Sequence, residues 1–390
     1  MSSSHLLAVS IQQHFGQIPD HRVKGRCEHR FLDIMTIALL AVLAGAEGWQ
    51  GIETYGQAKK TWLRTFLELP NGIPSHDTFR RVFAQIDPEA MESSFRHWVG
   101  TLIEHLGSEV IAIDGKTVKG SYDRNHNLKA LQLVSAWADE HRLVLGQTAV
   151  NSKSNEITAI PLLLEQLDLT GTIVSVDAMG TQTAIAHQIH QGGADYILAL
   201  KGNQGRLSQT AHNWFEGFER QEFDPEMVSD YFQGVESGHH RTETRQVWVF
   251  PAKEVFSSSV CSSWSGLQSL VVIRSQRRLW NQTTCETRFF LSSLDTDAQS
   301  FARYLRAHWG IENSLHWCLD VVFSEDASRI RTPQAAHNFS CLRRLALNLL
   351  RQHPGKESLK MKRYRAGLED TFLLSILSYA FSSVVTQKAS

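Results

Sequence analysis

Cysteine is scarce in this sequence, with five residues scattered over 390 positions. No two of them form a CxxC pair; they are Cys27, Cys261, Cys285, Cys318 and Cys341. An odd and scattered set argues against both a disulfide framework and a structural zinc site. We therefore expect a protein of a reducing cytoplasm.

Long apolar runs are also lacking. The longest, residues 34–46 (IMTIALLAVLAGA), is shorter than the ~20 residues that a membrane span needs, so it predicts a buried helix. The N-terminal stretch MSSSHLLAVSIQQHF has no basic region followed by an apolar core and a cleavage site, which argues against a secretory signal. We expect no membrane partner.

The sequence has no excess of either charge, since its formal net charge is −1. Composition therefore does not indicate a nucleic-acid-binding protein, and any DNA-binding surface must be confined to a basic part of the chain. Two basic stretches qualify, residues 21–30 (HRVKGRCEHR) and 343–365, although such runs are often only solvated faces. A third candidate is a short helix after the N-cap residue Ser75, in which Arg80 and Arg81 would face phosphate; packing helices share this pattern.

Hydrophobic periodicity divides the chain into segments. Residues 1–105 have helical period and predict an accessory, DNA-binding domain. Residues 106–200 predict the first part of an α/β core: a mixed sheet covered by helices. The expected strands are 110–113, 128–138, 142–150, 172–176 and 196–200, and the expected helices are 157–167 and 182–190.

The second half of the chain changes its pattern twice. Residues 201–296 carry alternating, β-branched runs and predict a β-rich insertion. Residues 297–333 return to helical period and would complete the core, and residues 334–390 predict a helical tail.

Three carboxylates stand out in this arrangement. The strand 110–113 is followed by Asp114, and the strand 172–176 is followed by Asp177. A continuous helix over 301–319 would place Glu312 in the middle of its apolar stripe, aimed at the interior, with His308 and His316 one turn on either side. A buried carboxylate must be paired, protonated or bound to metal. The three acids suit Mg²⁺ or Mn²⁺, and two such ions would clamp the oxygens of a phosphoryl displacement.

Other interpretations of the same residues stay open. An aspartate at a strand end is often a turn residue, and Glu312 could pair with Arg306 or Arg329. The spacing His308-x3-Glu312-x3-His316 could hold zinc, although it differs from the familiar zinc-helix motif. Glu325 and Asp326 are rival acids that we expect in a loop beyond the helix.

Five stretches resemble the DDE transposases of bacterial insertion sequences, specifically the H-repeat-associated subgroup. They are residues 18–49, AIDGKTVKGS (112–121), VSVDAMGTQ (174–182), DYILALKGNQ (195–204) and RAHWGIENSLHWCLDVVFSEDASRIR (306–331). Their agreement in order, over most of the chain, makes the resemblance specific.

The resemblance implies an RNase H-like core with Asp114, Asp177 and Glu312 as catalytic, metal-binding acids and the β-rich insertion between the second and third. It also implies that four residues line the DNA near the scissile phosphate: Lys116, Lys119, Lys201 and Asn203. The broader family has Tyr-x2-Arg-x3-Glu-x6-Lys around its glutamate, where this sequence has Leu305, His308 and Leu319. His308 would replace the arginine as a phosphate contact, and this departure leaves open whether cleavage passes through a DNA hairpin.

The expected function is DNA transposition: metal-dependent hydrolysis at the ends of a mobile element, then strand transfer into target DNA. The resemblance implies double-stranded DNA as partner, two Mg²⁺ or Mn²⁺ ions as cofactors and assembly of more than one subunit. Two alternatives are a DNA-binding protein that no longer catalyses and a nuclease that cuts without joining.

Overall fold

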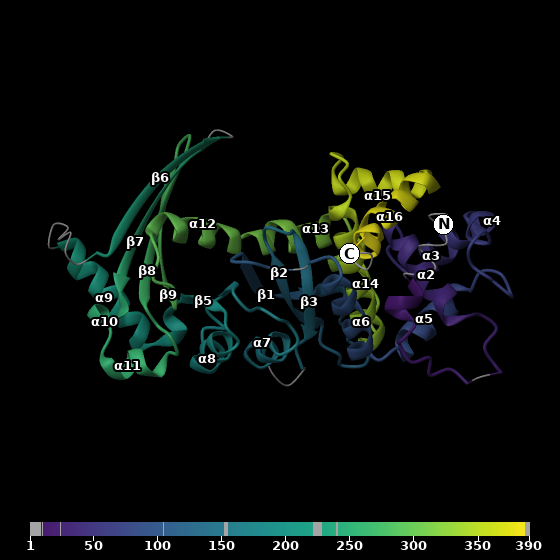
Figure 1. Cartoon of the computed structure of the whole chain (residues 1–390), viewed down its shortest axis with the longest axis horizontal. Helices are drawn as coiled ribbons and strands as arrows, with labels where there is room; N and C mark the ends of the chain where they lie inside the picture. The colour runs from purple at the N-terminus through teal and green to yellow at the C-terminus, as the bar shows by residue number, and fades with distance from the viewer. Residues whose placement is uncertain are drawn as a thin grey trace.

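The structure is a computed structural model that describes residues 9, 11–23, 25–103, 105–151, 155–220, 228–238 and 241–386, with side chains up to residue 379. It is a mixed α/β fold built on one sheet of nine strands in the order β3-β2-β1-β4-β5-β9-β8-β7-β6. Figure 1 shows the sheet in the middle and left of an elongated molecule, with the N-terminal and C-terminal helices gathered at the right. The predicted α/β class, a mixed sheet flanked by helices, is confirmed.

The chain before the sheet is helical, as predicted. The helix α2 contains most of the longest apolar run, up to Leu43, and its residues from Asp33 to Leu43 are all buried. Ser75 caps α5 as expected, because its side chain accepts a hydrogen bond from the Thr78 amide. No helix in the described ranges is both long and apolar enough to cross a membrane. The helices are α2 (Phe31–Leu43), α3 (Trp49–Ala58), α4 (Lys60–Leu63), α5 (His76–Gln85) and α6 (Pro88–Gly100).

The first five strands form the core of the sheet. Strand β1 runs parallel to β4, and β4 runs parallel to β5, while β2 and β3 join the other side of β1 in antiparallel pairs. All five strands occur where the sequence predicts them, but β1 does not end at Ile113; it continues through Asp114 as far as Val118. The strands are β1 (Val110–Val118), β2 (Leu131–Ala138), β3 (Leu143–Ala149), β4 (Ile173–Val176) and β5 (Asp195–Leu200).

The two faces of this core sheet bury different side chains, because neighbouring strand residues point to opposite faces. On one face, Val110 and Ile173 pack with Phe301 and Leu305 of α12 (Ala298–His308). On the other face, Ile111 and Val174 join the main core, which contains the apolar residues of two further helices. These are α7 (Glu156–Leu164) and α8 (Thr183–Gln191), drawn below the sheet in Figure 1.

The segment between the second and third acids extends the same sheet. Strand β9 pairs antiparallel with β5, and β8, β7 and β6 follow outward from it. The predicted β-rich character is present, but the segment also carries helices. Its elements are α9 (Arg206–Arg220), β6 (Asp230–Gly238), β7 (Arg241–Pro251), α10 (Ala252–Val255), α11 (Ser258–Ser263), β8 (Ser269–Leu279) and β9 (Thr283–Ser292).

The helix predicted over 301–319 is interrupted. It divides into α12, a π-helical segment (Ile311–His316) and α13 (Trp317–Val321). A short 3₁₀ turn (Glu325–Ala327) precedes the long helix α14 (Pro333–Gln352), which packs against β2, β3 and the N-terminal helices and so links the sheet to them. The helices α15 (Leu359–Leu368) and α16 (Asp370–Thr386) end the described chain.

Candidate active site

Asp114 and Asp177 lie on neighbouring parallel strands. The register of β1 and β4 pairs Ile113 with Val176, so the next position on each strand is one of the two acids. Asp114 is still inside β1, paired across the sheet with Ser135 of β2. Asp177 directly follows the last residue of β4. The register of a buried sheet is strongly fixed, so it sets the two carboxylates side by side.

Backbone amides orient both carboxylates. One Asp177 oxygen accepts hydrogen bonds from the amides of Met179 and Gly180, at 3.1 and 3.2 Å. The Asp114 oxygen Oδ1 accepts from the Gly115 amide at 2.8 Å. Asp177 therefore also makes a turn of the kind that its position after a strand suggests, and that role leaves its second oxygen available.

Glu312 lies on the π-helical segment, which packs against β1. The prediction that its side chain points into the interior is wrong, because Glu312 is exposed, as is Trp309. The prediction assumed 100° per residue throughout, whereas a π-helix adds an extra residue to the turn and rotates the following side chains. Single π-turns in α-helices are frequent at functional sites, and here the turn carries the predicted third acid.

Two histidines near Glu312 lie against the strands that carry the aspartates, His308 against β4 and His316 against β1. The Nδ1 atom of His308 is hydrogen-bonded to the hydroxyl of Ser175 in β4, at 2.8 Å. The Nδ1 atom of His316 lies 3.6 Å from an Asp114 oxygen. Burial lowers the pKa of His308 to about 4 and that of His316 to about 3, so both rings are neutral at pH 7. Glu312 therefore lies between a residue hydrogen-bonded to β4 and a residue close to Asp114 of β1.

The electrostatics of Asp114 show that the acids share one region. Its pKa is raised to about 7, mainly by burial; the hydrogen bond from the Gly115 amide lowers it, and the negative charges of Asp177, Glu156 and Glu312 add to the rise. Burial and mutual repulsion both disfavour the ionised form of a carboxylate. A cation bound among these groups would relieve that repulsion.

Glu156 is a fourth acid that the sequence analysis missed. It is the first residue of α7, is buried, and accepts a hydrogen bond from Gln132 at 2.7 Å. Burial raises its pKa, and so does the charge of Asp177. Its carboxylate lies over Gly115, where a Cβ atom would come within 2.0 Å of the Glu156 oxygen. The sequence contains one indication that a group packs closely here, the glycine at position 115, because a glycine within a strand often marks close approach of another group.

The donor chemistry of this region fits a hard divalent cation, because the groups are carboxylates. Within the described ranges, however, no three His, Cys, Asp or Glu side chains are arranged as a ready-formed metal cage. This holds for the zinc alternative as well: His308 bonds Ser175, His316 contacts Asp114, and Glu312 is exposed. Glu312 must move toward the aspartates for all three acids to share an ion.

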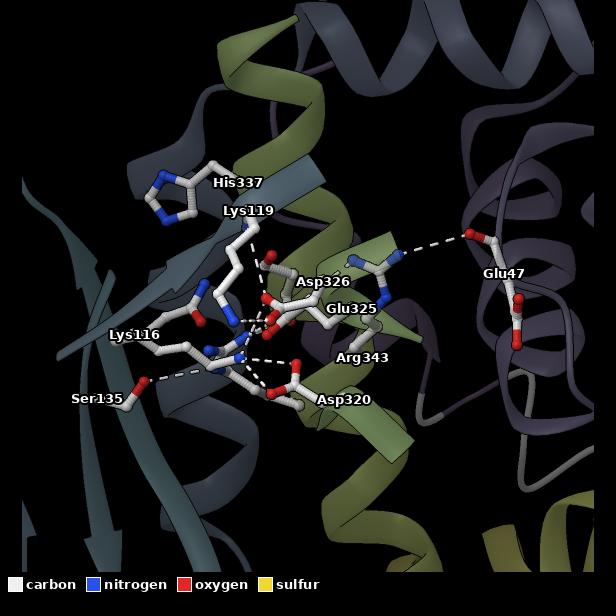
Figure 2. Close-up of polar contacts among 12 residues, drawn as sticks. Glu47, Lys116, Lys119, Ser135, Asp320, Glu325, Asp326, His337 and Arg343 are labelled. Atoms are coloured by element: carbon white, nitrogen blue, oxygen red, sulfur yellow. Dashed lines mark hydrogen bonds and ion pairs between the residues drawn. The ribbon is translucent and has the colours of Figure 1, made fainter. Parts of the chain in front are cut away.

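Lys116 and Lys119, two of the predicted DNA contacts, form ion pairs within the protein (Figure 2). The buried Lys116 ammonium lies 2.7 Å from Asp320 and 3.3 Å from Asp326. The exposed Lys119 lies 2.7 Å from Asp326. Lys116 therefore connects β1, the strand of Asp114, to α13, which follows Glu312, and its charge is already neutralised.

The rival acids are paired as well. Asp326 binds the two lysines, and Glu325 is fully buried with its Oε1 atom 3.0 Å from Arg344 and 3.9 Å from Arg343 (Figure 2). The arginine side chains come from α14, in the predicted basic stretch 343–365. Because Arg343, Arg344 and Arg363 are buried, that stretch is neither a solvated face nor an open basic surface at these positions.

The other predicted DNA contacts lie near the end of β5. Lys201 is exposed, directly after the strand, and Asn203 donates a hydrogen bond to the Ala178 carbonyl at 2.7 Å, beside Asp177. Arg80 and Arg81 are exposed on α5, and Lys24 of the first basic stretch lies outside the described residues. The DNA-binding roles of all these residues remain predictions.

Comparison with known protein families identifies the class of this protein. Residues 105–349 match the family described as "Transposase DDE domain", and residues 12–99 match the family described as "DDE_Tnp_1-associated". The chain therefore belongs to the DDE transposase family and is a DNA transposase by family.

Individual relatives cover nearly the whole chain. "Putative transposase YncI" of Escherichia coli O157:H7 is 41% identical over 377 residues, which is 95% of this chain and 94% of that protein. "H repeat-associated putative transposase YhhI" of E. coli K12 is 38% identical over 374 residues, covering 94% and 97%. The predicted H-repeat-associated subgroup is confirmed. Among solved structures, a piggyBac transposase synaptic complex with hairpin DNA is similar with a TM-score of 0.42 and 11% identity, over 95% of this chain and 78% of that one.

Proposed function

We propose that Asp114, Asp177 and Glu312 form the active site of a metal-dependent transposase that cuts DNA at the ends of a mobile element and joins them to target DNA. The observation that carries the proposal is the β1–β4 register, which sets two acids side by side under the helical segment that bears the third. DNA would be the partner, and more than one subunit would assemble on paired ends.

The three acids would hold one or two Mg²⁺ or Mn²⁺ ions. Such ions, when bound, neutralise charge on the phosphate and promote attack by a water oxygen. That attack breaks a phosphodiester bond and releases a 3′-hydroxyl; this hydroxyl then attacks a phosphodiester of the target, which releases a new 3′-hydroxyl there. The amides of Met179 and Gly180 fix the Asp177 carboxylate, and the neutral His308 holds the stretch before Glu312 to β4 through its hydrogen bond with Ser175.

The test uses purified protein and DNA from the borders of the gene, with Mg²⁺, Mn²⁺ or EDTA. We expect nicked and joined products only with a divalent metal, and none with Asp114→Asn, Asp177→Asn or Glu312→Gln. Glu254→Gln, an exposed acid on α10, is the matched control and should retain activity. Nicking by any of the three site variants at the wild-type rate would contradict the assignment of that residue.

The same experiment separates the alternatives. DNA binding without scission under any metal would identify a binding protein that has lost catalysis. Nicked products without joined ones would identify a nuclease. Light scattering with and without end DNA would test the proposed assembly of subunits.

A further inference from the structure

A groove beside the candidate active site concentrates positive charge. It has a volume of about 600 Å³ and lies between α12 with the π-helical segment and the strands β7, β8 and β9. Five arginines and two glutamates line it, which leaves three positive charges in a chain whose net charge is −1. The charged lining residues are Arg241, Arg245, Arg277, Arg288, Arg306, Glu243 and Glu286.

The groove reaches the third acid. Its lining includes Trp309 and Gly310 on one side of Glu312 and Asn313 and Ser314 on the other. In Figure 1, α12 meets the long β6–β9 strands partway along their length and runs toward α13, and the upper parts of these strands extend above the helix. A ligand in the groove would therefore lie against the residues on both sides of the exposed Glu312.

The arginines differ in how far the protein neutralises them. Arg245 pairs with Glu243 at 2.5 Å, Arg288 pairs with Glu286 at 2.6 Å, and Arg306 pairs with Glu236. The Arg288 guanidinium also lies 4.7 Å from the centre of the exposed Trp309 ring.

Arg241 and Arg277, in contrast, are exposed and take part in no ion pair within the ranges described. They lie on the neighbouring strands β7 and β8. Acidic residues are near them, since the charge of Arg241 lowers the pKa of Glu236 and Glu243 is the cross-strand neighbour of Arg277, but neither guanidinium is held in an ion pair in the part of the chain that the structure describes.

We propose that this groove binds the DNA strand that enters the candidate active site, with Arg241 and Arg277 on its phosphates. The proposal rests on the proposed transposase function and adds the path of the DNA. A row of guanidinium groups suits phosphate, because each planar fork donates two parallel hydrogen bonds. Phosphate contacts position a strand without reading its sequence, which is what delivery to an active site requires.

The groove also supplies unpaired cations, which Lys116 and Lys119 do not. Lys116 is buried and its charge is taken by Asp320 and Asp326, and Lys119 is paired with Asp326. Because binding to DNA depends on neutralising phosphates, unpaired arginines beside Glu312 are better suited than paired lysines to hold the strand there.

The chain offers a closely matched control for a test. Arg277 and Arg278 are consecutive, both exposed, and both in β8, but only Arg277 lines the groove, since neighbouring strand side chains point to opposite faces. Arg277→Ala and Arg278→Ala therefore remove the same charge from the same strand on opposite sides. Arg241→Ala and the double variant Arg241→Ala/Arg277→Ala extend the series.

The measurement is the Kd of a fluorescein-labelled DNA duplex from the gene borders, by anisotropy in EDTA over a series of salt concentrations. We expect Arg277→Ala and Arg241→Ala each to weaken binding several-fold and to reduce the slope of log K against log salt by about 0.9. The double variant should lose about twice that slope, and Arg278→Ala should bind as the wild type does.

Equal losses for Arg277→Ala and Arg278→Ala, or none for Arg277→Ala, would overturn the proposal. So would competition by polyglutamate as strong as that by unlabelled DNA, since the groove would then be an acidic-peptide site. Because the assay contains no metal, its outcome is separate from that of catalysis. A wild type that binds through Arg277 but never nicks would keep the groove and reject the proposed activity.

Discussion

Glu325 and Glu312 are two glutamates of the same segment whose replacement by glutamine should have opposite consequences. Glu325 is fully buried, with Arg344 at 3.0 Å and Arg343 at 3.9 Å. Both arginines are also buried, so Glu325→Gln leaves two guanidinium groups in the interior without their counter-charge. Glu312 is exposed on the π-helical segment and makes no such pair among the described residues.

The difference in stability expected between Glu325→Gln and Glu312→Gln follows from how deeply each glutamate is buried. Removing one partner of a buried ion pair costs roughly 3–5 kcal/mol, because the remaining charge stays desolvated. Lys116 adds a further positive charge that lowers the pKa of Glu325, as the two arginines do. An exposed substitution typically changes stability by less than about 0.5 kcal/mol. We therefore expect Glu325→Gln to lower the free energy of unfolding by several kcal/mol and Glu312→Gln to leave it unchanged.

The assay is urea unfolding followed by tryptophan fluorescence and circular dichroism, combined with the DNA cleavage assay. Glu312→Gln should unfold like the wild type and yet be inactive, because its loss is chemical. Glu325→Gln should unfold at lower urea, and any activity it retains at low temperature should still depend on metal. A destabilised Glu312→Gln or an unaffected Glu325→Gln would refute the assignment of the first glutamate to catalysis and the second to structure.

Three further variants test the supports of the site. The pKa of His308 is about 4 in the folded protein and about 6.5 in the unfolded chain, so the unfolded chain takes up the proton first and stability falls below pH 6.5. Between pH 7 and 5, the free energy of unfolding of the wild type should therefore fall by about 2 kcal/mol more than that of His308→Gln. Parallel curves of stability against pH for the two proteins would contradict the burial of His308. Gly115→Ala would place a Cβ atom 2.0 Å from a Glu156 oxygen, so it should lower the free energy of unfolding by about 1–3 kcal/mol and remove most of the activity. Gly146→Ala, whose Cβ atom would have its nearest neighbour at 3.4 Å, should be tolerated. Equal unfolding curves for the two variants would show that the Glu156 side chain moves aside without cost. Lys116→Met removes the buried partner of Asp320 and Asp326, which are themselves partly exposed, and should cost about 1–3 kcal/mol in a denaturation experiment. The exposed Lys119→Met should cost less, and the reverse order would contradict a structural role for Lys116.

The order of elements was predictable because each depends on local signals. Strands β4 and β5 lie within one residue of the predicted ranges, since short apolar runs bounded by turn residues fix them. The N-cap Ser75 was predictable for the same reason. The end of β1 was not, because an aspartate followed by a glycine reads as a turn, whereas pairing with β2 carries the strand on to Val118. That pairing is a tertiary interaction, which the local sequence does not contain.

In the candidate site, too, features that depend on local sequence were predictable and features that depend on tertiary packing were not. Asp114 and Asp177 were accessible from sequence because each follows an apolar run, and family resemblance added their roles. Glu156 was not, because its place beside Gly115 depends on how α7 packs against β2 and β3. The state of the positively charged residues was the least predictable feature of the site. The sequence does not reveal that Lys116 is neutralised by Asp320, which is 204 residues away.

The exposure of Glu312 and the rigidity of the two aspartates together suggest how such a site stays selective. Asp114 and Asp177 are fixed by strand register and amide hydrogen bonds, and the charge of Asp177 adds to the burial that raises the pKa of Asp114. Glu312 is the acid with freedom to move, because it is exposed on a π-turn. If it closes on the aspartates only when cations and a DNA strand are present, the active site is complete only with substrate in the groove. Metal alone should then protect the Glu312 segment from hydrogen exchange less than metal and DNA together, and full protection by metal alone would exclude this ordering.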